Sequence, residues 1–200
     1  MEFDINKLSS LIEEISSYED IELSDIPNLD LYMDQVITLF DSKLSHLRRN
    51  EDDKILTKTM INNYTKAKIL MPSTKKKYSK AHIILLILIY YLKQNLSISD
   101  ISLLFKDMIK TVESTKNESL EIEKIYQSFL HVKKADSSTL QEDLNKKVTL
   151  VLENTKDLSS KNLEFSQMLI TVLTLINQAN TYKRLSEKII DDFFTNYEFK

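Results

Sequence analysis

Glycine is absent from this chain of 200 residues, and proline occurs only twice. Glycine adopts positive φ more readily than any other residue, so its absence leaves few low-energy ways to build tight hairpins or helix C-caps. Leu, Ile, Lys, Glu and Ser are abundant, which favours an all-α chain. P-loops and Rossmann phosphate-binding turns are excluded because both need glycine. Cysteine is absent too, which excludes disulfides and thiolate zinc sites.

The stretch over residues 56–105 predicts a helix, a basic turn and two further helices. Its first part, residues 57–66, is a predicted helix that Thr57 can cap at the N-terminus. The apolar side of this helix is formed by Met60, Ile61 and Tyr64. The polar outer side carries Lys58, Thr59, Asn62, Asn63 and Lys66.

A turn with three consecutive cations follows this helix. It spans residues 73–78, after a proline that disfavours helix at the residue before it, and it contains Lys75, Lys76 and Lys77. Ser79 is the predicted N-cap of the next helix. Three lysines therefore lie between two predicted helices.

The helix over residues 80–94 is apolar on almost every side. Residues 83–92 contain no polar group except two tyrosine hydroxyls, so we expect this helix to be buried at the centre of a small domain. The apolar run is shorter than the ~18 residues that a membrane span needs. Ser97 and Asp100 match a capping box, which predicts a third helix directly afterwards.

These segments resemble the recognition helix, wing and following helix pair of MerR-type winged-helix regulators. The resemblance rests on TMINNY (59–64), ILMP (69–72), KYS (77–79) and LSISDI (96–101). More closely, the chain resembles the bacterial family called domain of unknown function 1836 (DUF1836), whose members share this core. The resemblance covers roughly residues 31–105 and implies a winged-helix domain with a minimal β wing.

By this resemblance, the helix over residues 57–66 would enter the major groove of double-stranded DNA and the turn over residues 73–78 would touch the backbone. MerR regulators usually have arginine at the position of Asn62, glycine at the position of Lys68, and a longer wing than this chain provides. The resemblance assigns base and phosphate contacts to Lys58, Thr59, Asn62 and Asn63, and phosphate contacts to Lys75, Lys76 and Lys77. Lys66, on the polar side of the same helix, is a further candidate phosphate contact.

The charge distribution supports an anion-binding face. The whole chain has a net charge of -3, yet residues 43–80 contain eleven lysines and arginines against three acids, a local charge of +8. Residues 1–30 contain nine acids and one lysine, a local charge of -8. Arg48 and Arg49 are candidate phosphate clamps, and the alternative is that they are ion-paired with neighbouring acids. Lysine and arginine contacts to phosphates provide affinity that does not depend on base sequence.

Residues 1–30 form the first predicted domain. Apolar residues at helical spacing predict an amphipathic helix over residues 4–17 with an acidic outer side. This arm either covers the basic face when DNA is absent or packs on the protein core. Residues 18–30 are a predicted polar connector, and residues 31–44 are predicted to begin the winged-helix domain.

Residues 106–200 form a predicted C-terminal helical bundle or coiled-coil region. Two helices are expected between residues 120 and 151, the second capped by Ser138 with Gln141. The run over residues 163–194 is the longest, and its broad apolar seam implies burial against more than one helix. A homodimer through these helices is favoured over a monomeric bundle. A small-molecule effector is a further alternative, in a pocket lined by Phe165, Met168, Tyr182 and Phe193.

Enzymatic chemistry has no support in the sequence. His46, His82 and His131 are widely spaced, and none forms the spacing that puts two metal ligands on one helical face. His82 is interpreted as a capping or surface residue. No cofactor is implied, and the N-terminus lacks the pattern of a secretion signal, so we expect a cytoplasmic protein. The sequence favours a DNA-binding transcriptional regulator, and the alternative is a protein-protein interaction adaptor on a winged-helix core.

Overall fold

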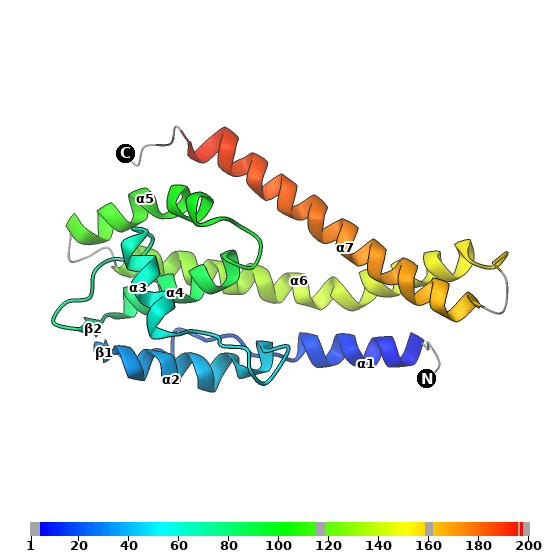
Figure 1. The fold of residues 1–200 in the computed structure, drawn as a ribbon, viewed down its shortest axis with the longest axis horizontal. Helices are drawn as coiled ribbons and strands as arrows, with labels where there is room; N and C mark the ends of the chain where they lie inside the picture. The colour runs from blue at the N-terminus through cyan, green and yellow to red at the C-terminus, as the bar shows by residue number, and fades with distance from the viewer. Residues whose placement is uncertain (1–4, 115–118, 159–161, 196, 198–200) are drawn as a thin grey trace. The chain divides into compact units, whose positions relative to one another are not determined.

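The computed structural model describes residues 5–114, 119–158, 162–195 and 197, and it is mostly helical with one small sheet (Figure 1). The chain divides into two compact units. The core unit consists of Glu19–Leu130 and Ser186–Lys200, and the outer unit consists of Met1–Tyr18 and His131–Leu185. The predicted predominance of helix is therefore confirmed.

The core unit contains one short sheet and most of the shorter helices. Its elements in chain order are β1 (Leu31–Tyr32), α2 (Met33–Leu44), the 3-10 turn η1 (Ser45–Leu47), α3 (Lys58–Lys66), β2 (Lys77–Tyr78), α4 (Lys80–Leu92), α5 (Ile98–Ser114), the first part of α6 (Ser119–Asn154) and the π-helical turn η3 (Ile190–Phe194). The strands β1 and β2 pair antiparallel, with Leu31 opposite Tyr78 and Tyr32 opposite Lys77.

Helix α4 is the buried centre of the core unit, as predicted. Five consecutive side chains, residues 83–87, are fully buried, because the helix has no polar face to present to water. Helices α2, α3, α5 and α6, β1 and β2 and the segments between these elements contribute the rest of the core. Its large side chains include Phe40, Leu44, Ile61, Ile69, Leu70, Ile101, Phe105, Ile122 and Tyr126.

The predicted helix starts are confirmed by their caps. The Thr57 hydroxyl accepts a hydrogen bond from the Met60 amide at 3.1 Å at the start of α3. At the start of α5, the Ser97 amide donates to the Asp100 carboxylate at 3.1 Å, and the Asp100 amide donates to the Ser97 hydroxyl at 3.2 Å. These side chains satisfy amides that have no partner within the helix.

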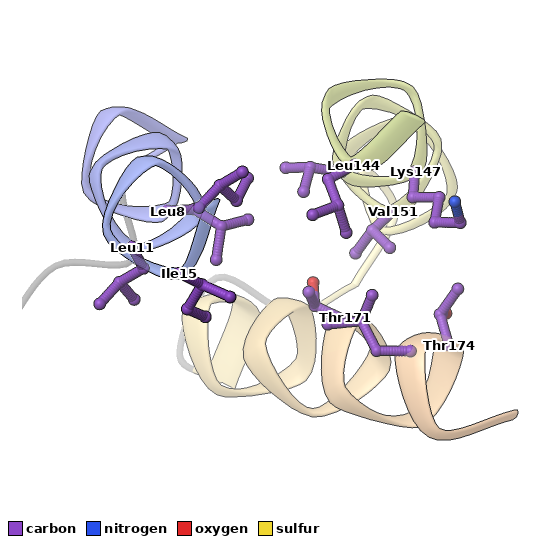
Figure 2. A pocket seen from close by; sticks show the side chains of 11 residues that line it. Leu8, Leu11, Ile15, Leu144, Lys147, Val151, Thr171 and Thr174 are labelled. Carbon is purple, nitrogen blue, oxygen red and sulfur yellow. The ribbon is translucent and has the colours of Figure 1, made fainter. Parts of the chain in front are cut away.

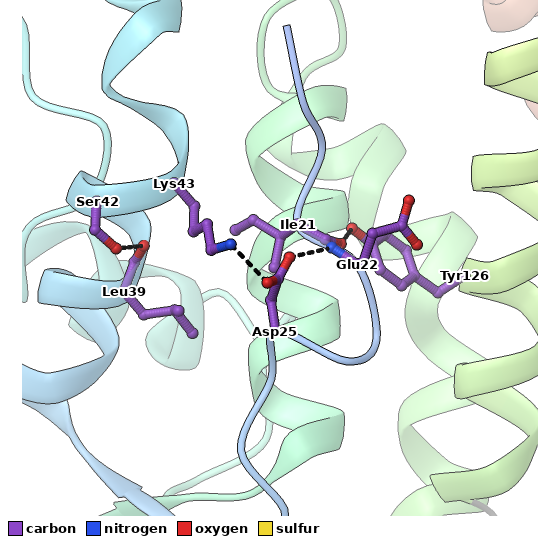
Figure 3. A network of polar contacts seen from close by, with 7 residues as sticks. All are labelled: Ile21, Glu22, Asp25, Leu39, Ser42, Lys43 and Tyr126. Carbon is purple, nitrogen blue, oxygen red and sulfur yellow. Dashed lines mark hydrogen bonds and ion pairs between the residues drawn. The ribbon is translucent and has the colours of Figure 1, made fainter.

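The connector before β1 is not the polar linker that was predicted. Ile21 and Ile26 are buried in the core. The Tyr126 hydroxyl of α6 donates to the Ile21 carbonyl at 2.6 Å, and Lys43 of α2 pairs with Asp25 at 2.5 Å (Figure 3). Polar residues outnumber apolar ones in this segment, and the two buried isoleucines follow neither a helical nor a strand spacing. The sequence pattern therefore gave no sign of their burial. The connector over residues 19–30 therefore packs against the core unit as part of it, and we call this segment the strap.

Helix α3 ends in a C-cap that normally needs glycine. Lys68 has a φ of 59°, its amide donates to the Thr65 carbonyl at 3.1 Å, and the Ile69 amide donates to the Tyr64 carbonyl at 3.1 Å. This is a Schellman motif, and Ile69 and Tyr64 supply the hydrophobic contact that usually accompanies it. Lysine therefore occupies a left-handed position in a chain without glycine.

Replacing Lys68 with glycine should raise the free energy of unfolding by about 1 kcal/mol, because glycine has no Cβ to clash at positive φ. Urea denaturation followed by circular dichroism measures the change. Lys66→Gly is the matched control, since this residue has helical geometry and the same substitution should destabilise by about 1 kcal/mol. Equal destabilisation by both variants would contradict the assignment of Lys68 to the cap.

The outer unit contains α1 (Ile5–Ser16), the second part of α6 and most of α7 (Leu163–Ile189). The helix predicted over residues 4–17 is confirmed as α1. Ile12 of α1, Val148 and Val151 of α6 and Thr171 of α7 are buried. A hydrogen bond of 3.2 Å from Gln167 to Thr155 also joins α7 to the end of α6.

Two predictions for the C-terminal region are wrong. The predicted break before Ser138 does not exist, because α6 runs without interruption and Ser138 donates its hydroxyl to the Ala135 carbonyl at 2.6 Å inside the helix. A serine hydroxyl can also donate to a carbonyl of the preceding turn inside a helix, so a serine at this position does not by itself mark a helix start. The longest described helix is consequently α6, with 36 residues, rather than the run that begins at residue 163.

The apolar seam of α7 is exposed instead of buried. Nine large apolar side chains of the part of α7 that lies in the outer unit are 37–63% exposed: Phe165, Met168, Leu169, Val172, Leu173, Leu175, Ile176, Tyr182 and Leu185. Phe193, at 67% exposed, is also outside any core. The alternative effector pocket lined by Phe165, Met168, Tyr182 and Phe193 gains no support from this exposure and stays a prediction.

Candidate nucleic-acid interface

The outer face of α3 is polar and exposed. Ile61 and Tyr64 are buried against the core, and this orientation turns the opposite side of the helix to solvent. The side chains that share this exposed face are Lys58, Thr59, Asn62, Asn63 and Lys66. The structure thus brings together the five residues predicted on this helix.

The lysine turn is a two-residue hairpin held in left-handed geometry. Thr74 and Lys77 exchange backbone hydrogen bonds of 3.1 and 3.0 Å, and the residues between them, Lys75 and Lys76, have φ values of 52° and 63°. Two positive φ angles are typical of a type I′ turn, where Asn-Gly is the usual pair. Left-handed geometry costs a residue with a Cβ about 1–2 kcal/mol. Both lysine side chains are exposed despite this strain.

The N-terminus of α2 lies between α3 and the lysine turn. Lys77 of the turn lies with its ammonium 5.2 Å from the centre of the Tyr32 ring. Lys58 of α3 forms an ion pair of 2.7 Å with Asp34, two residues further along. The Lys58 and Asp34 side chains are 63% and 76% exposed, so this pair contributes at most ~1 kcal/mol and can exchange Asp34 for another anion. The two lysine groups therefore share one edge of the core unit.

Arg48 and Arg49 are placed differently from each other. The Arg48 guanidinium pairs with Asp41 at 2.6 Å, and its Nε is buried without a hydrogen-bond partner among the described residues. Arg48 is thus engaged by α2. The Arg49 side chain is exposed, and its amide donates to Asp53 at 3.1 Å. Of the two predicted clamps, Arg49 has the more accessible side chain.

His82 connects the lysine turn to α4. Its Nδ1 accepts from the Ser79 amide at 3.2 Å, and its Nε2 lies 3.2 Å from the Pro72 carbonyl. An amide can only donate and a carbonyl can only accept, so the ring is neutral with its proton on Nε2. Tyr78 packs edge-on at 5.6 Å. Burial lowers the pKa of His82. The bond to the Pro72 carbonyl and the charge of Asp30 raise it by less, so the pKa lies below its ordinary value.

Acidification should weaken the contacts that the neutral His82 ring makes with Ser79 and Pro72. The folded-state pKa of His82 lies below its unfolded value of about 6.5, so the unfolded chain binds a proton first as the pH falls. The free energy of unfolding should therefore fall as the pH drops from about 6.5 towards the folded-state pKa. The slope from this group is at most about 1.4 kcal/mol per pH unit.

His82→Gln tests that prediction, because glutamine keeps the capping interaction with Ser79 and does not titrate. Urea denaturation at a series of pH values should give a flatter profile for the variant than for the native chain between pH 5 and 6.5. Identical slopes would show that His82 does not contribute to acid sensitivity.

The compact unit that carries these groups, Glu19–Leu130 with Ser186–Lys200, contains a family match. The sequence profile of the domain of unknown function DUF1836 matches residues 21–129, which is more than half of the chain. The chain belongs to this family. No curated protein and no solved structure has significant sequence or structural similarity to it.

The DUF1836 match covers the candidate interface and the elements that support it. It begins at Ile21, the buried anchor of the strap, and ends in α6, three residues after Tyr126, which holds that anchor. The predicted winged-helix domain over residues 31–105 lies inside the match. α3, the lysine turn and the strap therefore belong to one family unit.

Sequence reasoning missed several DUF1836 residues that organise this interface. Tyr32 and Asp34 hold lysines through side-chain contacts between elements, and a single sequence gives no signal for such pairs. The role of His82 in capping was anticipated, but its burial and its bond to Pro72 were not. A serine three residues before His82 was the available signal, because this spacing matches a capping box.

No group of three His, Asp or Glu side chains in the described part of the chain is arranged to hold a metal ion. None of the described helices combines the length and apolar composition needed to cross a bilayer.

Proposed function

We propose that the protein is a DNA-binding transcriptional regulator. Helix α3 lies in the major groove, and the turn with Lys75, Lys76 and Lys77 contacts the phosphate backbone beside it. This arrangement corresponds to a MerR-like winged helix with a minimal wing, in which β1 and β2 support the turn.

The strained lysines are the observation that carries this proposal. Lys68, Lys75 and Lys76 are the described residues that have positive φ, and all three are exposed lysines at positions where glycine or asparagine would be more stable. Backbone strain of this kind persists where function requires it. A cationic side chain at each position is explained if the partner is a polyanion.

The polar face of α3 supplies groups for reading bases. Asparagine can make two hydrogen bonds to adenine in the major groove, so Asn62 and Asn63 are the candidate base contacts. Thr59 can contact either type of base pair. Lys58 and Lys66 lie on either side of these residues and bind phosphates. Lys58 leaves its ion pair with Asp34 to bind a phosphate of the DNA. Arg49 is a further phosphate contact, and Arg48, engaged by Asp41, positions the loop.

A titration of the full chain against random duplex DNA at 50 and 200 mM salt tests the proposal. The six proposed phosphate contacts should lower the affinity by a factor on the order of 10³ between these conditions. Fluorescence anisotropy with a labelled duplex measures it. Absence of binding at 50 mM salt, or binding that does not depend on salt, would contradict DNA recognition.

The regulator is proposed to act as a homodimer through α7. Residues 165–182 contain no charged side chain, and most of the large apolar ones among them are exposed. Large exposed apolar patches mark interaction surfaces, and two-fold readers of DNA bind paired half-sites. A second copy of the same seam provides a matching apolar surface.

Replacing Leu169 and Ile176 together with lysine should convert the dimer to a monomer, since both lie on one side of α7, two turns apart, and four buried cations per dimer would be unpaired. Light scattering coupled to size-exclusion chromatography measures the mass. Asn177→Lys is the control, because this exposed residue lies on the flank of the seam, and the variant should stay dimeric. A native chain that is monomeric at micromolar concentration would contradict the dimer.

The exposed α7 seam also favours the alternative function, a non-catalytic adaptor that binds another protein. The two proposals differ in their response to DNA. An adaptor has no reason to bind random duplex in a salt-dependent way, so the titration above separates them.

A further inference from the structure

The outer unit contains a pocket between α1, α6 and α7. Its volume is about 190 Å³, and Leu8 and Ile15 of α1, Leu144 and Val151 of α6 and Thr171 of α7 are among its lining residues (Figure 2). Figure 2 shows side chains from three helices directed into one space. A cavity of about 150 Å³ with such a lining stays dry and binds benzene, so this pocket can hold a slightly larger apolar group.

The polar groups of the pocket restrict what it can hold. The Thr171 hydroxyl already donates to the Gln167 carbonyl at 2.8 Å, so it has no proton to offer a guest. Lys147 is the charged residue among those that line the pocket. In Figure 2 its carbon chain follows the wall and its ammonium lies at the edge, where it donates to the Asp143 carbonyl over a long 3.5 Å. The interior thus suits an apolar chain, and the edge suits an anion.

We propose that this pocket binds a small amphiphile with an aliphatic chain of about six to eight carbons and an anionic head such as a carboxylate. The chain occupies the space between α1, α6 and α7, and the head pairs with Lys147 at the edge. Charge-assisted hydrogen bonds from an ammonium to a carboxylate are about twice as strong as neutral ones. Among ligands with the same chain length, the pocket should therefore prefer a carboxylate head over a neutral or cationic one. This site does not depend on the proposed DNA binding.

Isothermal titration calorimetry of the full chain with octanoate tests the site. Octanoate should bind saturably at one site per chain, and at least tenfold more tightly than octylamine, which has the same chain and the opposite charge. Lys147→Gln should weaken octanoate binding about tenfold and change the binding of neutral 1-octanol less than twofold. Equal affinities for octanoate and octylamine, or no saturable binding of octanoate, would overturn the proposal.

Ile15→Glu provides the matched variant. Ile15 lines the pocket but is 59% exposed, so the substitution should be tolerated by the fold while it places a carboxylate against the guest. Octanoate binding should be lost. Leu29→Glu, at a residue 63% exposed in the core unit, is the control and should bind as the native chain does. Octanoate binding by Ile15→Glu at native affinity would place the guest elsewhere and overturn the assignment.

Discussion

Replacing Lys75, Lys76 and Lys77 together with alanine should weaken binding to every DNA duplex alike and reduce the salt dependence of log K by up to about 3. The physical reason is that each lysine releases about one counterion when it neutralises a phosphate. Anisotropy titrations on two unrelated duplexes, each at several salt concentrations, measure both effects. A loss confined to one duplex would instead assign base reading to the turn.

A second variant separates the charge of the turn from its strain. Lys75→Asn with Lys76→Gly introduces the preferred type I′ pair, and it should raise the free energy of unfolding by about 1–2 kcal/mol. The same variant removes two cations, so DNA binding should weaken while stability increases. These opposite changes exclude unfolding as the cause of weaker binding.

The matching control keeps the strain and removes the charge. Lys75→Gln with Lys76→Gln retains a Cβ at both left-handed positions, so stability should stay close to that of the native chain and the salt dependence should fall by about 2. Native affinity in both double variants would mean that the turn does not contact phosphates, and the proposed orientation on DNA would be wrong.

The elements that were predictable from sequence are those with a strong local pattern. The helix over residues 57–66 was predicted because Thr57 caps it and Ile61 and Tyr64 face one side, and the structure agrees. Helix α4 was predicted to be buried because it has no polar side. Local spacing and capping determine such features, so a single sequence contains the information.

Features that depend on distant contacts or on tolerated strain were not predictable. The absence of glycine argued against tight hairpins, yet the turn at Lys75 and Lys76 and the cap at Lys68 both use positive φ. The surrounding sheet and core hold the backbone there, which propensity alone does not reveal. Ser138 has the same local signal in a cap and in a helix interior, so the length of α6 could not be read from it.

The candidate interface shows the same division. The exposed face of α3 follows from helical spacing, whereas the pairing of Lys58 with Asp34 and the engagement of Arg48 by Asp41 join separate elements. Which of two neighbouring arginines is accessible depends on where α2 passes.

Replacing Ile21 with alanine should lower the free energy of unfolding by about 2–5 kcal/mol, the range for truncating a fully buried aliphatic side chain. This is a large part of the 5–15 kcal/mol that stabilises a typical domain. Ile21 lies in the strap, where a polar linker was predicted, and a linker residue would contribute within about 0.5 kcal/mol. Urea denaturation of the native and variant chains measures the difference.

Two further variants show whether the strap acts through Ile21 in particular. Tyr126→Phe removes the buried hydroxyl that donates to the Ile21 carbonyl, and it should destabilise by about 1–3 kcal/mol because that carbonyl loses its partner. Leu29→Ala is the control in the same strap, since Leu29 is 63% exposed and its truncation should have little effect. If all three variants had native stability, the strap would be peripheral. If Ile21 and Tyr126 matter and Leu29 does not, the folded domain begins before β1, because the buried Ile21 side chain and the bond from Tyr126 to its carbonyl are then part of the core that supports the sheet and the lysine turn.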